Sequence, residues 1–140
     1  MVISNQALPK LEKAGIVGLI EPINPYWVPN YFLNDFDLGL KIVKTLDHPN
    51  LRLMLDLFHL QYLTGNMTNN IKNYLPWSGH VQIAQVPTRH EPNSPGENDY
   101  KYVLKQLELE NYQGWIGLEY LPQGGTDDGL NWIKEFGYSL

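Results

Sequence analysis

The fold of this chain is decided by the stretch GWIGLEY at residues 114–120, an apolar run that ends in a carboxylate. A short apolar run bounded by glycine is typical of a buried strand in a parallel sheet. Near the start of the chain, IVGLI at residues 16–20 leads in the same way into Glu21. Because packing gives no reason for a glutamate at the end of a buried strand, Glu21 and Glu119 are candidates for a functional site.

Strands and helices alternate along the rest of the chain. Apolar runs predict four strands, at residues 16–21, 51–55, 80–84 and 114–120. Helical spacing and capping residues predict five helices. The first covers residues 5–14, the second runs from Asn30 or Asn34 to about residue 45, and a short third one includes residues 71 and 75. The fourth runs from Asn98 or Asp99 to about residue 111, and the last from Asp127 or Asp128 to residue 136. This order indicates an α/β fold with right-handed crossovers and a parallel sheet covered by helices.

The bulk composition excludes several classes of protein. With 140 residues, the chain has the size of one domain, which we expect to span 1–140. A net charge of −5 gives no basic surface for nucleic acid or an anionic membrane. The absence of cysteine excludes disulfides, thiolate nucleophiles and Cys-ligated zinc. No apolar run is long enough to span a bilayer and no signal peptide is evident, so we expect a cytoplasmic location.

Four polar residues stand at the ends of the four predicted strands: Glu21, Asp56, Gln82 and Glu119. Their spacing matches a (β/α)8 barrel, in which one unit has roughly 31 residues and the C-terminal ends of the strands carry the catalytic groups. Three carboxylates at one point would repel one another unless a cation lay among them. An all-oxygen donor set suits a hard divalent ion, so the sequence predicts a Mg²⁺ or Mn²⁺ site.

Several polar residues of the chain also have an ordinary structural interpretation. Asp56 could cap a helix, and Gln82 could satisfy buried backbone groups. His59 could be a hydrogen-bonded core histidine. Arg89 and Glu91 could form a surface ion pair of little energetic value. The functional interpretation is favoured because four independent caps would not share one period along the chain.

Four segments carry a resemblance to a known family: LIEPIN (19–24), LDLFHLQ (55–61), GHVQIAQVPTRHEPNSPGE (79–97) and YQGWIGLEYLP (112–122). They resemble hydroxypyruvate isomerases, which belong to the xylose isomerase-like TIM-barrel superfamily. The resemblance implies reversible isomerisation of hydroxypyruvate to 2-hydroxy-3-oxopropanoate through an enediolate, with a divalent metal and no nucleotide cofactor. A related alternative is a ketose 3-epimerase, although those enzymes usually have His where this chain has Gln82.

The resemblance also implies roles for single residues. Glu21 and Glu119 match the paired catalytic glutamates, which also ligate the metal. Asp56 and Gln82 match the other two ligands, and His59 and Arg89 match positions that contact substrate. An arginine at position 89 would suit a substrate carboxylate, which a guanidinium binds through two hydrogen bonds. The expected partner is therefore a small molecule, with no role for nucleic acid or membrane.

The chain departs from the family in length. It contains about four β/α units of the TIM-type barrel, and these resemble the C-terminal half. Three explanations remain open at this point: a truncated product or gene model, a naturally short isoform, or a half-barrel that forms a homo-oligomer to close the sheet. A half-barrel without activity of its own, acting only with a partner, is the non-catalytic alternative.

Overall fold

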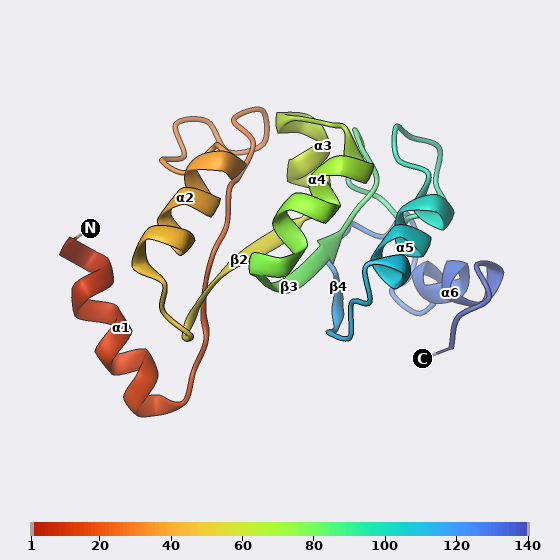
Figure 1. Cartoon of the computed structure of the whole chain (residues 1–140). Helices are drawn as coiled ribbons and strands as arrows, with labels where there is room; N and C mark the ends of the chain where they lie inside the picture. Colours follow the sequence, from red (N-terminus) through yellow and green to blue (C-terminus); the bar gives the residue numbers. More distant parts are fainter. Residues whose placement is uncertain (1, 140) are drawn as a thin grey trace.

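The computed structural model describes residues 2–139 and contains one parallel sheet (Figure 1). The strands lie in the order β1-β2-β3-β4, and every neighbouring pair is parallel. Their bounds are β1 Gly18–Ile20, β2 Leu51–Asp56, β3 Ser78–Ile83 and β4 Ile116–Leu118. The predicted sequence of strands is therefore confirmed, with parallel pairing throughout.

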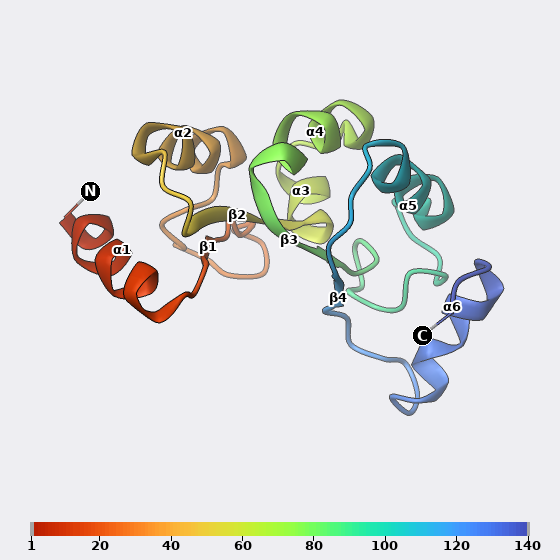
Figure 2. The same ribbon diagram turned by 60° about the horizontal axis from the view of Figure 1, so that its bottom comes forward.

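Helices connect the strands and cover one side of the curved sheet. Figure 2 shows α2, α4 and α5 side by side along that face, with the two termini at opposite ends of the arc. The α-helices are α1 Val2–Ala14, α2 Phe36–Leu46, α3 Leu57–Leu63, α4 Met67–Tyr74, α5 Tyr100–Leu109 and α6 Asn131–Glu135, with 3₁₀ turns η1 Leu75–Trp77 and η2 Asp128–Leu130. Four β/α units in an open arc confirm the predicted half-barrel.

The hydrophobic core lies between this helical layer and the two central strands. Leu53 and Leu55 of β2 and Val81 and Ile83 of β3 are fully buried, and Phe36 of α2 packs into the same cluster. Each central strand has a neighbour on both sides, and its buried apolar side chains pack towards the helices in alternation with less buried residues. This rigid centre holds the C-terminal ends of β2 and β3 in place.

The two outer strands differ from the prediction of fully buried runs. The strand predicted at 114–120 is ordered only as Ile116–Leu118, and Trp115 beside it is 87% exposed. The strand predicted at 16–21 is reduced to Gly18–Ile20, and Ile16 is 55% exposed. The physical reason is their position, since among residues 2–139 β1 and β4 each have a single neighbouring strand and lose the cover that a second one would provide.

The helix starts are partly as predicted. Asp99 caps α5, accepting a hydrogen bond from the backbone N–H of Tyr102. The cap of α2 is Asp35 rather than Asn30 or Asn34, because its Oδ1 lies 3.0 Å from the N–H of Leu38. Helix α3, which the sequence analysis did not predict, begins directly after Asp56. No helix within residues 2–139 combines the length and apolar character that crossing a membrane would require.

The identity of the α2 cap gives a direct test of the structure. Replacing Asp35 by alanine should lower the free energy of unfolding by about 1 kcal/mol, because an N–H of the first turn loses its acceptor. The matched control is Asn34→Ala, one residue earlier and equally exposed, which should change stability by less than about 0.5 kcal/mol. Urea denaturation followed by circular dichroism measures both, and a larger cost for Asn34→Ala would show that the cap is assigned one residue too late.

Candidate active site

The polar residues at the strand ends meet along one edge of the sheet. In the pairing register, Asp56 lies opposite Gln82, and Gln82 lies opposite Gly117. Glu119 directly follows β4, and its N–H donates to the carbonyl of Ile83. Because all strands are parallel, their C-terminal ends share this edge. The strand order therefore puts Glu21 and Glu119 on the two outer strands, with Asp56 and Gln82 between them.

Asp56 and Gln82, at the ends of the two central strands, each have a buried side-chain oxygen without a hydrogen-bond partner in the described part of the chain. Asp56 is 1% exposed, and its Oδ1 accepts a 2.8 Å hydrogen bond from the N–H of Phe58 in the first turn of α3. Its other oxygen, Oδ2, and Oε1 of Gln82 are buried and lack a hydrogen-bond partner within the described residues. Buried polar atoms are nearly always paired, so two unpaired oxygens at one edge indicate a site for a ligand.

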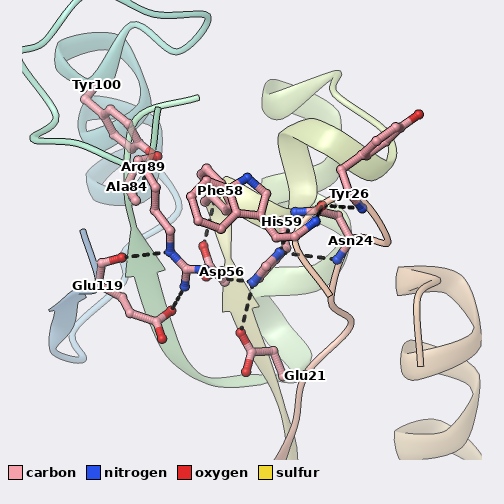
Figure 3. A network of polar contacts seen from close by, with 11 residues as sticks. Glu21, Asn24, Tyr26, Asp56, Phe58, His59, Ala84, Arg89, Tyr100 and Glu119 are labelled. Carbon is pink, nitrogen blue, oxygen red and sulfur yellow. Dashed lines mark hydrogen bonds and ion pairs between the residues drawn. The ribbon is translucent and has the colours of Figure 1, made fainter. Parts of the chain in front are cut away.

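Glu21 and His59 extend this group on the β1 side (Figure 3). Nε2 of His59 lies 3.6 Å from Oδ2 of Asp56 and 3.8 Å from Oε1 of Glu21. One potential ligand atom from each of these three residues lies within 4.8 Å of the others. With Gln82 in register, the donor set is rich in oxygen, which fits a divalent cation of the Mg²⁺ or Mn²⁺ type.

Burial and mutual repulsion shift the protonation of this cluster. Burial, with the charges of Glu119 and Glu21, raises the pKa of Asp56 to about 8. Burial and the charge of Glu119 also raise the pKa of Glu21. Burial, with the positive charge of Arg89, lowers the pKa of His59 to about 4, so that its ring is neutral at physiological pH. The metal-free cluster therefore keeps protons that a bound cation would displace.

The raised pKa of Asp56 has a consequence for stability. The folded chain holds the Asp56 proton more tightly than the unfolded chain, so the metal-free protein loses stability as the pH rises from about 4 to about 8. Asp56→Asn keeps the oxygen that caps α3 and removes the buried charge. At about pH 8 and without metal, the variant should melt roughly 5 °C higher, a gain of about 2 kcal/mol.

Scanning calorimetry of both proteins with a chelator present tests this result. The exposed Asp127→Asn is the matched control and should leave the melting temperature unchanged. The difference between wild type and Asp56→Asn should shrink at about pH 4, where the wild-type carboxyl is protonated. A lower melting temperature for Asp56→Asn at pH 8 would contradict the buried, destabilising charge.

Arg89 contacts the site from the long loop after β3. Its Nη2 lies 2.8 Å from Oε2 of Glu119, and its Nε donates to the Glu119 carbonyl at 3.3 Å. The guanidinium carbon is 4.9 Å from the ring centre of Phe58 and 5.4 Å from that of Trp27. These two rings meet edge to face at 5.3 Å. Arg89 is therefore held between an aromatic pair and a candidate catalytic carboxylate.

The alternative of a surface ion pair between Arg89 and Glu91 is wrong. Glu91 is 7% exposed, and its carboxylate accepts hydrogen bonds from the backbone N–H and the side-chain amide of Gln123. These contacts join the loop after β3 to the loop after β4. Glu91 thus has a structural role that its place in a polar loop did not suggest.

Two residues of the site region were missed in the sequence analysis, Asn24 and Gln85. Both are buried, and each bonds to groups from more distant parts of the chain. Asn24 contacts His59, and Gln85 holds the loop that carries Arg89. The only signal in the sequence is that each lies in a segment that resembles the known family, because neither follows a helical or strand period.

The fold and the site together define an α/β half-barrel whose strands deliver carboxylates to one edge. The model of the family described as "Xylose isomerase-like TIM barrel" matches residues 4–136, and the chain belongs to that family. The match covers nearly all the strands and helices described above.

Individual relatives agree with this assignment. A protein of Danio rerio named "Putative hydroxypyruvate isomerase" is 49% identical over 127 residues, covering 90% of this chain and 46% of the relative. A "2-oxo-tetronate isomerase" of Cupriavidus necator is 43% identical over 122 residues, covering 87% of this chain and 46% of the relative. A crystal structure from Brucella melitensis titled "AP endonuclease, family 2" superposes with a TM-score of 0.86 at 41% identity, covering 92% and 50% of the two chains.

These matches confirm the resemblance to hydroxypyruvate isomerases. They also show that the chain spans about half the length of the curated relatives it matches.

Proposed function

We propose that this chain carries the proton-transfer and metal-binding site of an isomerase that interconverts hydroxypyruvate and 2-hydroxy-3-oxopropanoate. The observation that carries the proposal is the pair of unpaired buried oxygens, Asp56 Oδ2 and Gln82 Oε1, between two strand-end glutamates. Buried polar atoms are nearly always paired, so these two oxygens are suited to binding a ligand. The names of the relatives support isomerase chemistry on a 2-oxo acid.

The reaction needs two groups that exchange protons with neighbouring carbons. One carboxylate removes a proton from C3 of hydroxypyruvate, and the other delivers a proton to C2. The proton of the C3 hydroxyl moves to the oxygen on C2, so the product has an aldehyde at C3 and a hydroxyl at C2. Glu21 and Glu119 suit this pair because they stand on the two outer strands with the central residues between them.

The pKa of Glu21, raised by burial and by the charge of Glu119, favours its use as an acid or base near neutral pH. A carboxyl group whose pKa is raised binds a proton more tightly, which makes it a stronger base towards a carbon-bound proton.

A divalent metal would be held by the oxygens of Glu21, Asp56, Gln82 and Glu119. When bound, it would supply positive charge to the oxygen atoms on which the enediolate charge develops. Arg89 supports the substrate in a different way. Its guanidinium is fixed in place by Trp27 and Phe58 and can bind the carboxylate of a 2-oxo acid.

The test is an assay of the whole chain with hydroxypyruvate in deuterated water, with and without added Mg²⁺ or Mn²⁺. We expect metal-dependent incorporation of solvent deuterium at C2 of the product, detected by proton NMR. The melting temperature should also rise on addition of the metal, because an ion that binds only the folded chain stabilises it.

A panel of substrates separates the alternatives. A four-carbon 2-oxo acid tests the range of acids accepted, and a ketose tests the 3-epimerase interpretation. Turnover of the ketose in preference to both acids would replace the proposed function. Metal binding without turnover of any substrate would favour a half-barrel that acts only with a partner, and light scattering would then show whether the chain is a monomer.

A further inference from the structure

Asn24 uses its buried side chain to complete a local network beside the site (Figure 3). Its Oδ1 accepts hydrogen bonds from the backbone N–H groups of Tyr26 at 3.1 Å and Trp27 at 3.0 Å. Since both are backbone donors, the amide orientation is determined. Nδ2 of Asn24 therefore faces Nδ1 of His59, 2.8 Å away.

The His59 ring receives a second donor on the same nitrogen. The backbone N–H of Asn24 lies 3.2 Å from Nδ1. A backbone N–H can only donate, so Nδ1 must be an unprotonated acceptor. The single ring proton is then on Nε2, the nitrogen that faces Glu21 and Asp56.

We propose that Asn24 is a positioning residue that holds His59 as the Nε2–H tautomer, which makes His59 a hydrogen-bond donor in the site and prevents it from binding metal. Its position next to Glu21 and Asp56 would otherwise suit a ligand. A metal needs a free nitrogen lone pair, but Nε2 carries a proton and the lone pair of Nδ1 is engaged by Asn24. The cation site then consists of oxygens alone.

The catalytic consequence rests on the proposed isomerase function. A neutral N–H group fixed at the edge of the cluster can donate to a substrate oxygen as negative charge develops on it. Asn24 would prepare this donor before substrate binds. Through Tyr26 and Trp27, the same side chain also orders the turn that places Trp27 against Phe58 and Arg89.

The tautomer is tested directly by long-range ¹H–¹⁵N NMR of the ¹⁵N-labelled chain without metal, at neutral pH. An unprotonated ring nitrogen resonates far downfield of a protonated one, and His59→Gln identifies the signals of this ring. We expect the downfield signal at Nδ1 of His59 in the wild-type chain. A wild-type spectrum with the proton on Nδ1 overturns the proposal, whatever any variant does.

Asn24→Asp tests the role of the amide. The carboxylate can still accept from Tyr26 and Trp27, but it replaces the donor that faces Nδ1 with an acceptor. We expect the Nδ1 signal to move upfield as that nitrogen gains a proton. Asn70→Asp is the matched control, since the side-chain amide of Asn70 also acts as a hydrogen-bond donor but lies outside the site. If folded Asn24→Asp gave the same spectrum as the wild type, the backbone N–H of residue 24 alone would set the tautomer of His59. That result would overturn the proposed role of the Asn24 side chain.

Metal affinity and kinetics complete the test. Titration with Mn²⁺ followed by electron paramagnetic resonance should show that His59→Gln loses no more than about 100-fold in affinity, the range for a residue that only supports the ligands, whereas a larger loss would identify His59 as a ligand. With hydroxypyruvate, Asn24→Asp should lower kcat by about 100-fold with little change in KM. The spectroscopic and metal measurements need no turnover, so failure of the proposed function leaves them decisive.

Discussion

Glu119→Gln should lower the turnover of hydroxypyruvate by about 1,000-fold, because an amide can neither take a proton from carbon nor return one. The substitution conserves size, and its oxygen can still accept a hydrogen bond from Arg89. Since the side chain of Glu119 is 46% exposed, the melting temperature should hardly change. A large kinetic effect with unchanged stability would identify a proton-transfer residue.

Comparing Glu119→Gln with Glu21→Gln tests whether the two carboxylates act on different carbons of the substrate. If the two carboxylates act on different carbons, each variant should block the overall isomerisation. One of the two variants retains the carboxylate that acts on C3, and it should still exchange the C3 hydrogen of hydroxypyruvate with deuterated water. The other variant lacks that base and should exchange hydrogen at neither C3 nor C2. Glu110→Gln, an exposed change outside the site, is the control. Turnover close to the wild-type rate in either site variant would contradict the proposed acid–base pair.

Gln85→Leu should be the most destabilising change in the loop that carries Arg89. The Gln85 side chain is 1% exposed, and its Oε1 accepts from the backbone N–H groups of Val86 and Asn98, both at 3.0 Å. Its Nε2 donates to three loop carbonyls, at 2.9 to 3.3 Å. Leucine fills a similar volume but leaves all five backbone groups unpaired, for an expected cost of about 4 kcal/mol.

Urea denaturation measures this loss as a lower midpoint with an unchanged slope. Gln113→Leu is the matched control, because Gln113 is exposed and bonds only to its own neighbourhood. Hydrogen exchange should show faster exchange at the amides of Val86 and Asn98 in Gln85→Leu. A loss of less than about 1 kcal/mol would mean that water replaces these bonds, so that Gln85 does not hold the loop.

Gly96 explains why the loop can close over Gln85 at all. A Cβ at this position would collide with the Gln85 side chain and with the carbonyl of Val86. The backbone of the loop therefore packs directly on the amide that it binds. This close approach fixes the loop from position 87 onward, and with it Arg89, whose backbone adopts a positive φ of 59°.

The alternation of apolar runs and capping residues was enough to predict the four β/α units. It was also enough to predict that Glu21, Asp56, Gln82 and Glu119 share one edge, because parallel strands necessarily align their C-terminal ends. Both inferences depend on local patterns, and local patterns can be read from the chain. The roles of these four residues in metal binding and proton transfer remain predictions, which the substitutions and metal titrations test.

The contacts that turn these residues into a site were decided by the tertiary structure. Arg89 pairs with Glu119 across 30 positions, and Asn24 meets His59 across 35. No periodicity encodes such pairs, because they depend on where two loops come to lie after the sheet has formed. Burial of GWIGLEY at 114–120 was mispredicted for the same reason: a strand is buried by its neighbours in space, and in the described part of the chain β4 has a single neighbouring strand.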